Sequence, residues 1–167
     1  MNRRAMNPVS ARGMFICVAL AALLRPCAHA AVTTCTVTAT GVAFGTYTPL
    51  TPIALTSTAT LSVTCTVTTH RNTITIDLST GASNRFTPRT MTSGANILNY
   101  NLYLDAADTQ IWGDGTGGSV IDSITLIRVG GGTKSVSANA TVYGAVAALQ
   151  DPAPGSYTDT ITVSVNY

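Results

Sequence analysis

The segment from Ser156 to Tyr167, SYTDTITVSVNY, decides the fold class. Its apolar residues alternate with Thr, Ser and Asn, and they are Ile161, Val163, Val165 and Tyr167. A two-residue period is typical of a β-strand that is buried on one face. Domains usually finish in frayed or polar residues, whereas this sequence stops inside a strand on an aromatic residue. We therefore expect a strand here and ask what covers its apolar face.

The first thirty residues have the pattern of an export signal. Arg3, Arg4 and Arg12 form a basic region, and the apolar run MFICVALAALL follows at residues 14–24. Ala28-His-Ala30 fits the small-x-small cleavage pattern. The run is too short for a membrane span, which needs about 20 apolar residues. We predict that residues 1–30 are a signal peptide and that residues 31–167 form one exported domain.

Removing the signal changes the charge balance. Four of the nine basic residues lie within residues 1–30, so five remain against seven Asp, and the net charge falls from +2 to −2. The predicted domain contains no Glu and no basic cluster. Binding to nucleic acid requires phosphate neutralisation by many cations, so this class of function is excluded.

The composition after residue 30 predicts an all-β domain. All 29 Thr lie in this region, and β-branched residues suit a pleated sheet. Short candidate strands recur between turn residues, at 35–39, 42–47, 59–68, 73–79, 97–104, 119–129, 135–146 and 156–167. The segment 119–129 has apolar residues on both faces, which indicates a bulge or cover on both sides. Regular short strands without helices indicate a β-sandwich.

Two cysteines remain after cleavage, Cys35 and Cys65. Cys35 shares its strand face with Val37, and Cys65 shares its face with Val63 and Val67, so both thiols should point inward. In an oxidising compartment such a pair forms a disulfide. We predict a Cys35–Cys65 disulfide and no metal site, because these two residues and His70 offer too few ligands.

Catalytic chemistry has little support in the sequence. His70 lies where a strand ends, which is typical of a solvated turn. The glycine-rich stretch 112–118 hints at a calcium turn but lacks the series of oxygen ligands that such a loop requires. There is no Gly-x-Ser-x-Gly motif and no free thiol. We expect no enzyme activity, no cofactor and no small-molecule substrate.

Several stretches together resemble the spore coat protein U family, which includes the subunits of archaic, Csu-type chaperone–usher pili. They are CTVTATGVAFGTYTPL (35–50), LSVTCT (61–66), LNYNLYLDAADTQIWGDGTGG (98–118), TVYGAV (141–146) and PGSYTDTITVSVNY (154–167). The resemblance implies an incomplete immunoglobulin-like β-sandwich that lacks its final strand. A periplasmic chaperone fills the resulting groove first, and a donor strand from a neighbouring subunit replaces it in the fibre.

The resemblance implies a function and partners. The chain would be a subunit of a surface pilus or coat that supports adhesion and biofilm formation. It would be exported through the periplasm to the cell surface, with a chaperone, an outer-membrane usher and neighbouring subunits as partners. The edge that meets the partner strand would be lined by Ile161, Val163, Val165 and Tyr167. A bare apolar edge of this kind is otherwise an aggregation hazard.

Two alternatives stay open at this point. Another part of the chain could cover the edge and complete the sandwich, or the chain could be a self-contained binding module, for carbohydrate or a surface ligand, that uses Trp112 and the glycine loops. The sequence also departs from a polymerising pilin. Only residues 31–34 would precede Cys35 after cleavage, and four residues are shorter than a strand of about 17–20 Å. We therefore expect a subunit that receives a strand but gives none, at the tip or as a minor component.

Overall fold

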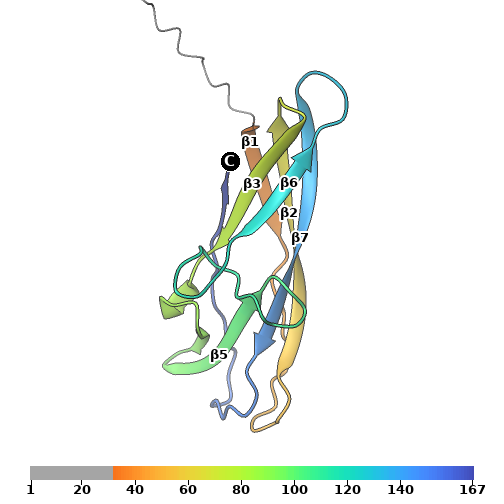
Figure 1. The fold of residues 1–167 in the computed structure, drawn as a ribbon. Coiled ribbons are helices and arrows are strands. Elements are labelled where there is room, and N and C mark those ends of the chain that lie inside the picture. Colours follow the sequence, from red (N-terminus) through yellow and green to blue (C-terminus); the bar gives the residue numbers. More distant parts are fainter. Residues whose placement is uncertain (1–31) are drawn as a thin grey trace, which may run out of the picture.

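The computed structural model describes residues 32–167, so the predicted signal peptide lies outside the described residues. Within this range the chain forms strands and one turn of 3-10 helix at Gly81–Ser83 (Figure 1). The strands are β1 Val32–Ala39, β2 Leu55–Val67, β3 Arg71–Leu78, β4 Arg89–Ser93, β5 Asn96–Tyr103, β6 Asp122–Ile127, β7 Lys134–Val146 and β8 Val163–Asn166. No helix in residues 32–167 is long and apolar enough to cross a membrane.

The strands form two antiparallel sheets with a shared core. One sheet has the order β1-β2-β7-β5-β4, and the other has the order β6-β3-β8. Along β2 the inward residues Leu61, Val63, Cys65 and Val67 are at most 1% exposed, whereas the residues between them face outward and are Ser or Thr. The result is the predicted all-β, incomplete immunoglobulin-like sandwich, in which β1 and β8 each have one partner strand.

A disulfide joins β1 to β2. Cys35 and Cys65 are direct cross-strand partners, and their Sγ atoms are bonded at 2.10 Å. Cys65 is fully buried in the core, as its parity predicted. The predicted pairing is confirmed.

Two expected strands differ from the structure, and one strand was not predicted. The segment 42–47 is not a strand, because Gly45 takes a positive φ of 77° and the segment has no ladder partner. The short strand β4 was missed, since its residues are Arg, Thr, Met, Thr and Ser and show no apolar alternation. The C-terminal strand is shorter than 156–167, because the chain there passes from Thr92 on β4 to Ser79 after β3, and neither sheet gives it a continuous ladder.

The segment 119–129 contains neither the expected bulge nor cover on both faces. β6 pairs with β3 without a shift of register. Leu126 is buried in the core, while Ile121, Ile127 and Val129 are exposed. These three exposed residues form the second apolar set of the segment, and this set faces outward.

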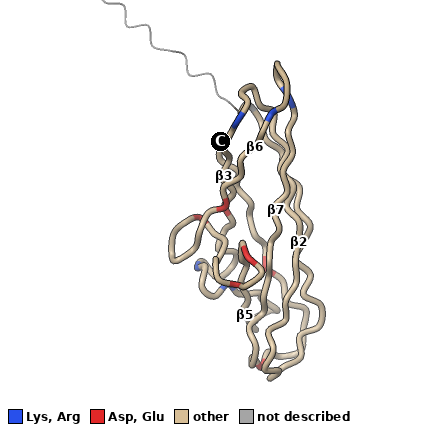
Figure 2. The backbone as a smooth tube through the Cα atoms, turned by 45° about the vertical axis from the view of Figure 1, so that its right-hand side comes forward, with Lys and Arg blue, Asp and Glu red and all other residues tan. Residues whose placement is uncertain are grey.

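Charged residues are sparse along the sheets. Three basic residues lie at strand ends: Arg71 at the start of β3, Arg128 just after β6, and Lys134 at the start of β7. Figure 2 shows basic residues gathered at the end of the sandwich that holds the C-terminus. β1 and β8 themselves carry no charged side chain. These two edge strands thus lack the charges that often protect free sheet edges.

Candidate functional site

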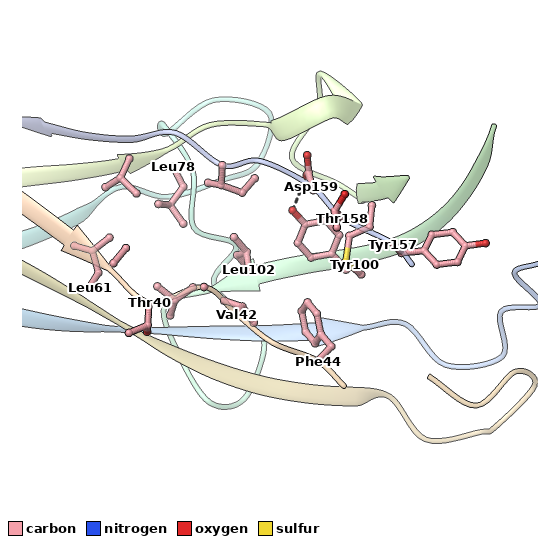
Figure 3. A pocket seen from close by; sticks show the side chains of 16 residues that line it. Thr40, Val42, Phe44, Leu61, Leu78, Tyr100, Leu102, Tyr157, Thr158 and Asp159 are labelled. Atoms are coloured by element: carbon pink, nitrogen blue, oxygen red, sulfur yellow. Dashed lines mark hydrogen bonds between the residues drawn. The ribbon is translucent and has the colours of Figure 1, made fainter. Parts of the chain in front are cut away.

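An apolar groove opens between the chain that follows β1 and the C-terminal segment. One wall is the chain after β1, with Thr40, Val42 and Phe44, and the other wall is the C-terminal segment (Figure 3). The cavity measures about 350 Å³. Side chains from both sheets form its floor, namely Leu61, Leu78, Met91, Tyr100, Leu102 and Val142. The groove therefore opens directly onto the core of the sandwich.

The backbone of the C-terminal segment presents a free edge to this groove. Ser79 N donates to Thr162 O at 3.0 Å, so the backbone groups of Thr162 point toward the β3 side. In an antiparallel ladder this direction alternates along the strand. The register Asp77↔Ser164 continues the same pattern. The N–H and C=O groups of Ile161, Val163 and Val165 consequently point away from β3, toward the groove.

The structure brings together some of the predicted edge residues. Ile161 and Val163 line the cavity. Val165 is half-buried in the same row of side chains but is not among the lining residues. Tyr167 follows the end of β8 and is 59% exposed. The cavity thus contacts the first half of the predicted edge.

Sequence reasoning missed the opposite wall of the groove. Val42 and Phe44 point inward although their segment forms no strand. Their approach depends on Gly144 of β7, where an added Cβ would lie 2.8 Å from both Phe44 Cζ and Val42 Cγ1. The two-residue spacing of Val42 and Phe44 was visible in the sequence, but their place beside the C-terminal segment was not.

The groove contains one carboxylate. The hydroxyl of Tyr100 donates to Asp159 Oδ2 at 2.6 Å, and the backbone N–H groups of Ala82 and Thr160 donate to Oδ1 at 2.9 and 2.8 Å. Burial, together with the hydrogen bond to Asp159, raises the pKa of Tyr100 well above its usual range. Tyr100 therefore remains a hydrogen-bond donor at physiological pH.

Beneath this pair lies a fully buried arginine, Arg89. Its guanidinium donates to Ser79 O at 3.1 and 2.9 Å, to Asn101 Oδ1 at 2.9 Å and to Trp112 O at 2.7 Å. It also lies 5.1 Å from the ring centroid of Phe86. Burial lowers the pKa of Arg89, and attraction to Tyr100 and Asp159 offsets part of this effect. The cation ties β4, β5 and the end of β3 together beneath the groove.

A second cavity of about 640 Å³ continues the groove away from β8. It shares Val42, Phe44, Met91 and Tyr157 with the first cavity. Its outer wall includes Pro152 and Pro154. Proline has no backbone N–H, so this wall offers fewer donors to a strand than Ile161 and Val163 do.

The residues considered for ligand binding, catalysis or metal coordination lie outside the groove. Trp112 is fully buried, and its Nε1 donates to Ile76 O at 2.9 Å, so the alternative in which Trp112 contributes to a binding surface is wrong. His70 is exposed in the turn before β3, as predicted. Asp114 accepts hydrogen bonds from Thr116 within its own loop. Among residues 32–167, no group of three or more His, Cys, Asp or Glu side chains could hold a metal ion.

A family comparison decides where the chain belongs. A model of the spore coat protein U domain matches residues 22–164. The chain is a member of the spore coat protein U domain family. The match covers every strand of the sandwich except the last residues of β8. No curated protein sequence matches this family member.

A solved structure shares the fold of this spore coat protein U domain. It is a chain of the CsuC–CsuE chaperone–tip adhesion subunit pre-assembly complex, from the archaic chaperone–usher Csu pili of Acinetobacter baumannii. The TM-score is 0.54 and the sequence identity is 21% over 80% of this chain. The alignment covers 39% of the other chain, so the similarity concerns less than half of that protein.

Proposed function

We propose that this protein is a structural subunit of a chaperone–usher surface fibre and that its groove accepts an extended strand from a partner. The apolar groove beside the free backbone edge of the C-terminal segment carries the proposal. An extended partner there would gain backbone hydrogen bonds from Ile161, Val163 and Val165 and would bury alternate side chains against the core. Membership of the spore coat protein U family and the fold shared with a chain of a Csu pilus complex support this role.

The partners follow from this mechanism. A periplasmic chaperone holds the groove during export, an outer-membrane usher receives the complex, and a neighbouring subunit supplies the final strand. The protein thus reaches the cell surface or an extracellular fibre. Its role is structural and not enzymatic. The Cys35–Cys65 disulfide suits an oxidising compartment outside the cytoplasm.

We also propose a place at the tip or as a minor subunit. Val32 already belongs to β1 and pairs with Val67, so cleavage after Ala30 would leave only Ala31 ahead of the sandwich. Such a subunit receives a strand and donates none.

Apolar loops support a part in adhesion and biofilm formation. The loop before β2 and the loop after β7 lie at the end opposite the C-terminus (Figure 1). In these loops Leu50, Ile53 and Leu149 are 63%, 72% and 64% exposed. Reciprocal backbone hydrogen bonds join the two loops, from Leu50 N to Gln150 O and from Leu149 N to Thr51 O. Exposed apolar side chains held in this way offer a contact surface.

The test is co-expression in the periplasm with the cognate chaperone, followed by pull-down. We expect Val163→Asp to lose chaperone capture, because the carboxylate would enter an apolar groove at a cost of several kcal/mol. Thr162→Asp is the matched control, since Thr162 is exposed and a surface substitution changes stability by about 0.5 kcal/mol or less. A protein that stays folded, soluble and unbound with its C-terminal segment intact would contradict the proposal.

A further inference from the structure

A carboxylate interrupts the apolar row on the C-terminal wall of the groove. Tyr157, Asp159, Ile161, Val163 and Val165 recur at every second position and are all half-buried, whereas the residues between them are exposed. Asp159 is the one charged member of this row, and it lines the cavity. A charged side chain at an inward position of a core-facing strand is costly unless something compensates it.

The fold makes room for this carboxylate. At Gly81, whose φ is +63°, an added Cβ would lie 2.1 Å from Asp159 Oδ2. Tyr100, Ala82 and Thr160 supply three hydrogen bonds. A carboxylate can accept about four hydrogen bonds, so Asp159 has the capacity for one more. Arg89 attracts Asp159, but its hydrogen bonds go to other groups.

The surroundings of Asp159 differ from the rest of the groove. Leu61, Leu78 and Val163 make the half near β8 aliphatic. At the other half, Figure 3 shows Tyr100 next to Asp159 and Phe44 on the opposite wall, whereas the ring of Tyr157 points away from Asp159. The Phe44 and Tyr100 rings are in edge contact, with centroids 5.9 Å apart. Aromatic faces and a carboxylate together favour a cation, through cation–π attraction and a charge-assisted hydrogen bond.

We propose that Asp159 selects a partner strand that carries Lys or Arg at the position facing it. The proposal rests on the strand-acceptor function. A partner with apolar residues throughout would remove water from the carboxylate without replacing its hydrogen bond. A basic side chain supplies both the donor and the opposite charge. Asp159 therefore acts as a specificity determinant that fixes the register of the incoming strand.

The geometry defines the sequence that the groove accepts. Side chains on one face of an extended strand are two residues apart, about 6.6–6.8 Å. The basic residue should therefore lie two positions from the apolar residue that faces Ile161 and four from the one that faces Val163. A shift by two positions would place the cation in the aliphatic half, which has no carboxylate among its lining residues.

The test compares peptides on the exported protein after release from any co-purified chaperone, because a bound chaperone would itself fill the groove. Fluorescent peptides carry alternating Leu and differ only at the position facing Asp159, which is Lys, norleucine or Glu. Norleucine matches the length of Lys without its charge. We expect the Lys peptide to bind at least about tenfold more tightly than the norleucine peptide, with Glu weakest, and the preference to shrink in high salt because exposed charges are screened.

Two protein variants test whether the preference for the Lys peptide depends on Asp159. Asp159→Asn keeps an acceptor for Ala82 and Thr160 and removes the charge, so the preference for Lys should fall to about twofold or less. Asp151→Asn at an exposed site should leave the preference unchanged. The peptide series uses the unaltered protein and decides the matter even where Asp159→Asn folds poorly. Equal binding of the Lys and norleucine peptides overturns this inference alone, whereas failure of every peptide to bind overturns the strand-acceptor function as well.

Discussion

At the scale of single residues, the two-residue alternation of apolar side chains predicted which of them are buried. It did not predict the buried polar residues. Leu61, Val63 and Cys65 are buried as their alternation indicated. Arg89 is equally buried, although a charged residue is almost never fully buried without partners. Its partners are carbonyl oxygens of Ser79 and Trp112, far along the chain. Local sequence carries no signal for contacts of this kind.

Arg89 should be one of the most sensitive positions for stability. We expect Arg89→Ala to lower the free energy of unfolding by about 3–5 kcal/mol, because the carbonyl groups of Ser79 and Trp112 would lose their donor inside the core. Urea unfolding of the exported protein measures the change. Arg85→Ala is the control, since Arg85 is exposed and should change stability little. Equal effects of the two variants would show that the buried network contributes nothing.

The disulfide is the second sensitive feature at this scale. We expect Cys65→Ser to destabilise the domain by about 2–5 kcal/mol and to reduce the yield of exported protein. Chemical unfolding of the oxidised wild type, the reduced wild type and the variant separates the loss of the bond from the change of side chain. Titration of two free thiols in the folded exported protein would contradict the pairing.

At the scale of elements, prediction succeeded where a strand has neighbours on both sides. β2 and β7 pair along thirteen residues, and their alternation was clear in the sequence. It failed for β4, which has little apolar alternation, and for the C-terminal segment, where only Val163–Asn166 forms a ladder. Periodicity reports which face is buried, but it does not report whether a partner strand is present.

Hydrogen exchange should distinguish the two edges of the C-terminal segment. In the unbound protein, we expect the amides of Ile161, Val163 and Val165 to exchange rapidly, while those of Ser164 and Asn166 are protected by β3. Capture of an extended partner should slow exchange of the first three by about tenfold or more. NMR resolves these amides individually. Protection of Val163 and Val165 before any partner is added would indicate that the chain covers its own edge.

At the scale of the whole molecule, the sandwich has a well-packed core and one open groove, between the chain after β1 and the C-terminal segment. β1 is an edge strand of one sheet and β8 an edge strand of the other. The groove lies between the chain that follows β1 and the segment that leads into β8. The fold class and the C-terminal strand beside this groove could be predicted from the sequence. The opposite wall and the hydrogen-bond partners of Asp159 could not, because both depend on which distant segments the topology brings together.

The open groove and the position at which β1 begins together predict how the protein assembles. With cleavage after Ala30, only Ala31 precedes β1, and residues 32–39 are held against β2 by a disulfide-linked ladder. No part of the exported chain ahead of β1 is then long enough to fill a second copy's groove, which needs a strand of about 17–20 Å. We expect the protein, once released from its chaperone, to form complexes with other subunits but no long fibres of its own. Mass spectrometry of the exported N-terminus establishes the cleavage site, and electron microscopy detects fibres. Fusing a segment of alternating apolar residues before Ala31 should convert the protein into a polymerising subunit. Fibres of the unmodified protein alone would contradict the proposed place at the tip or as a minor subunit.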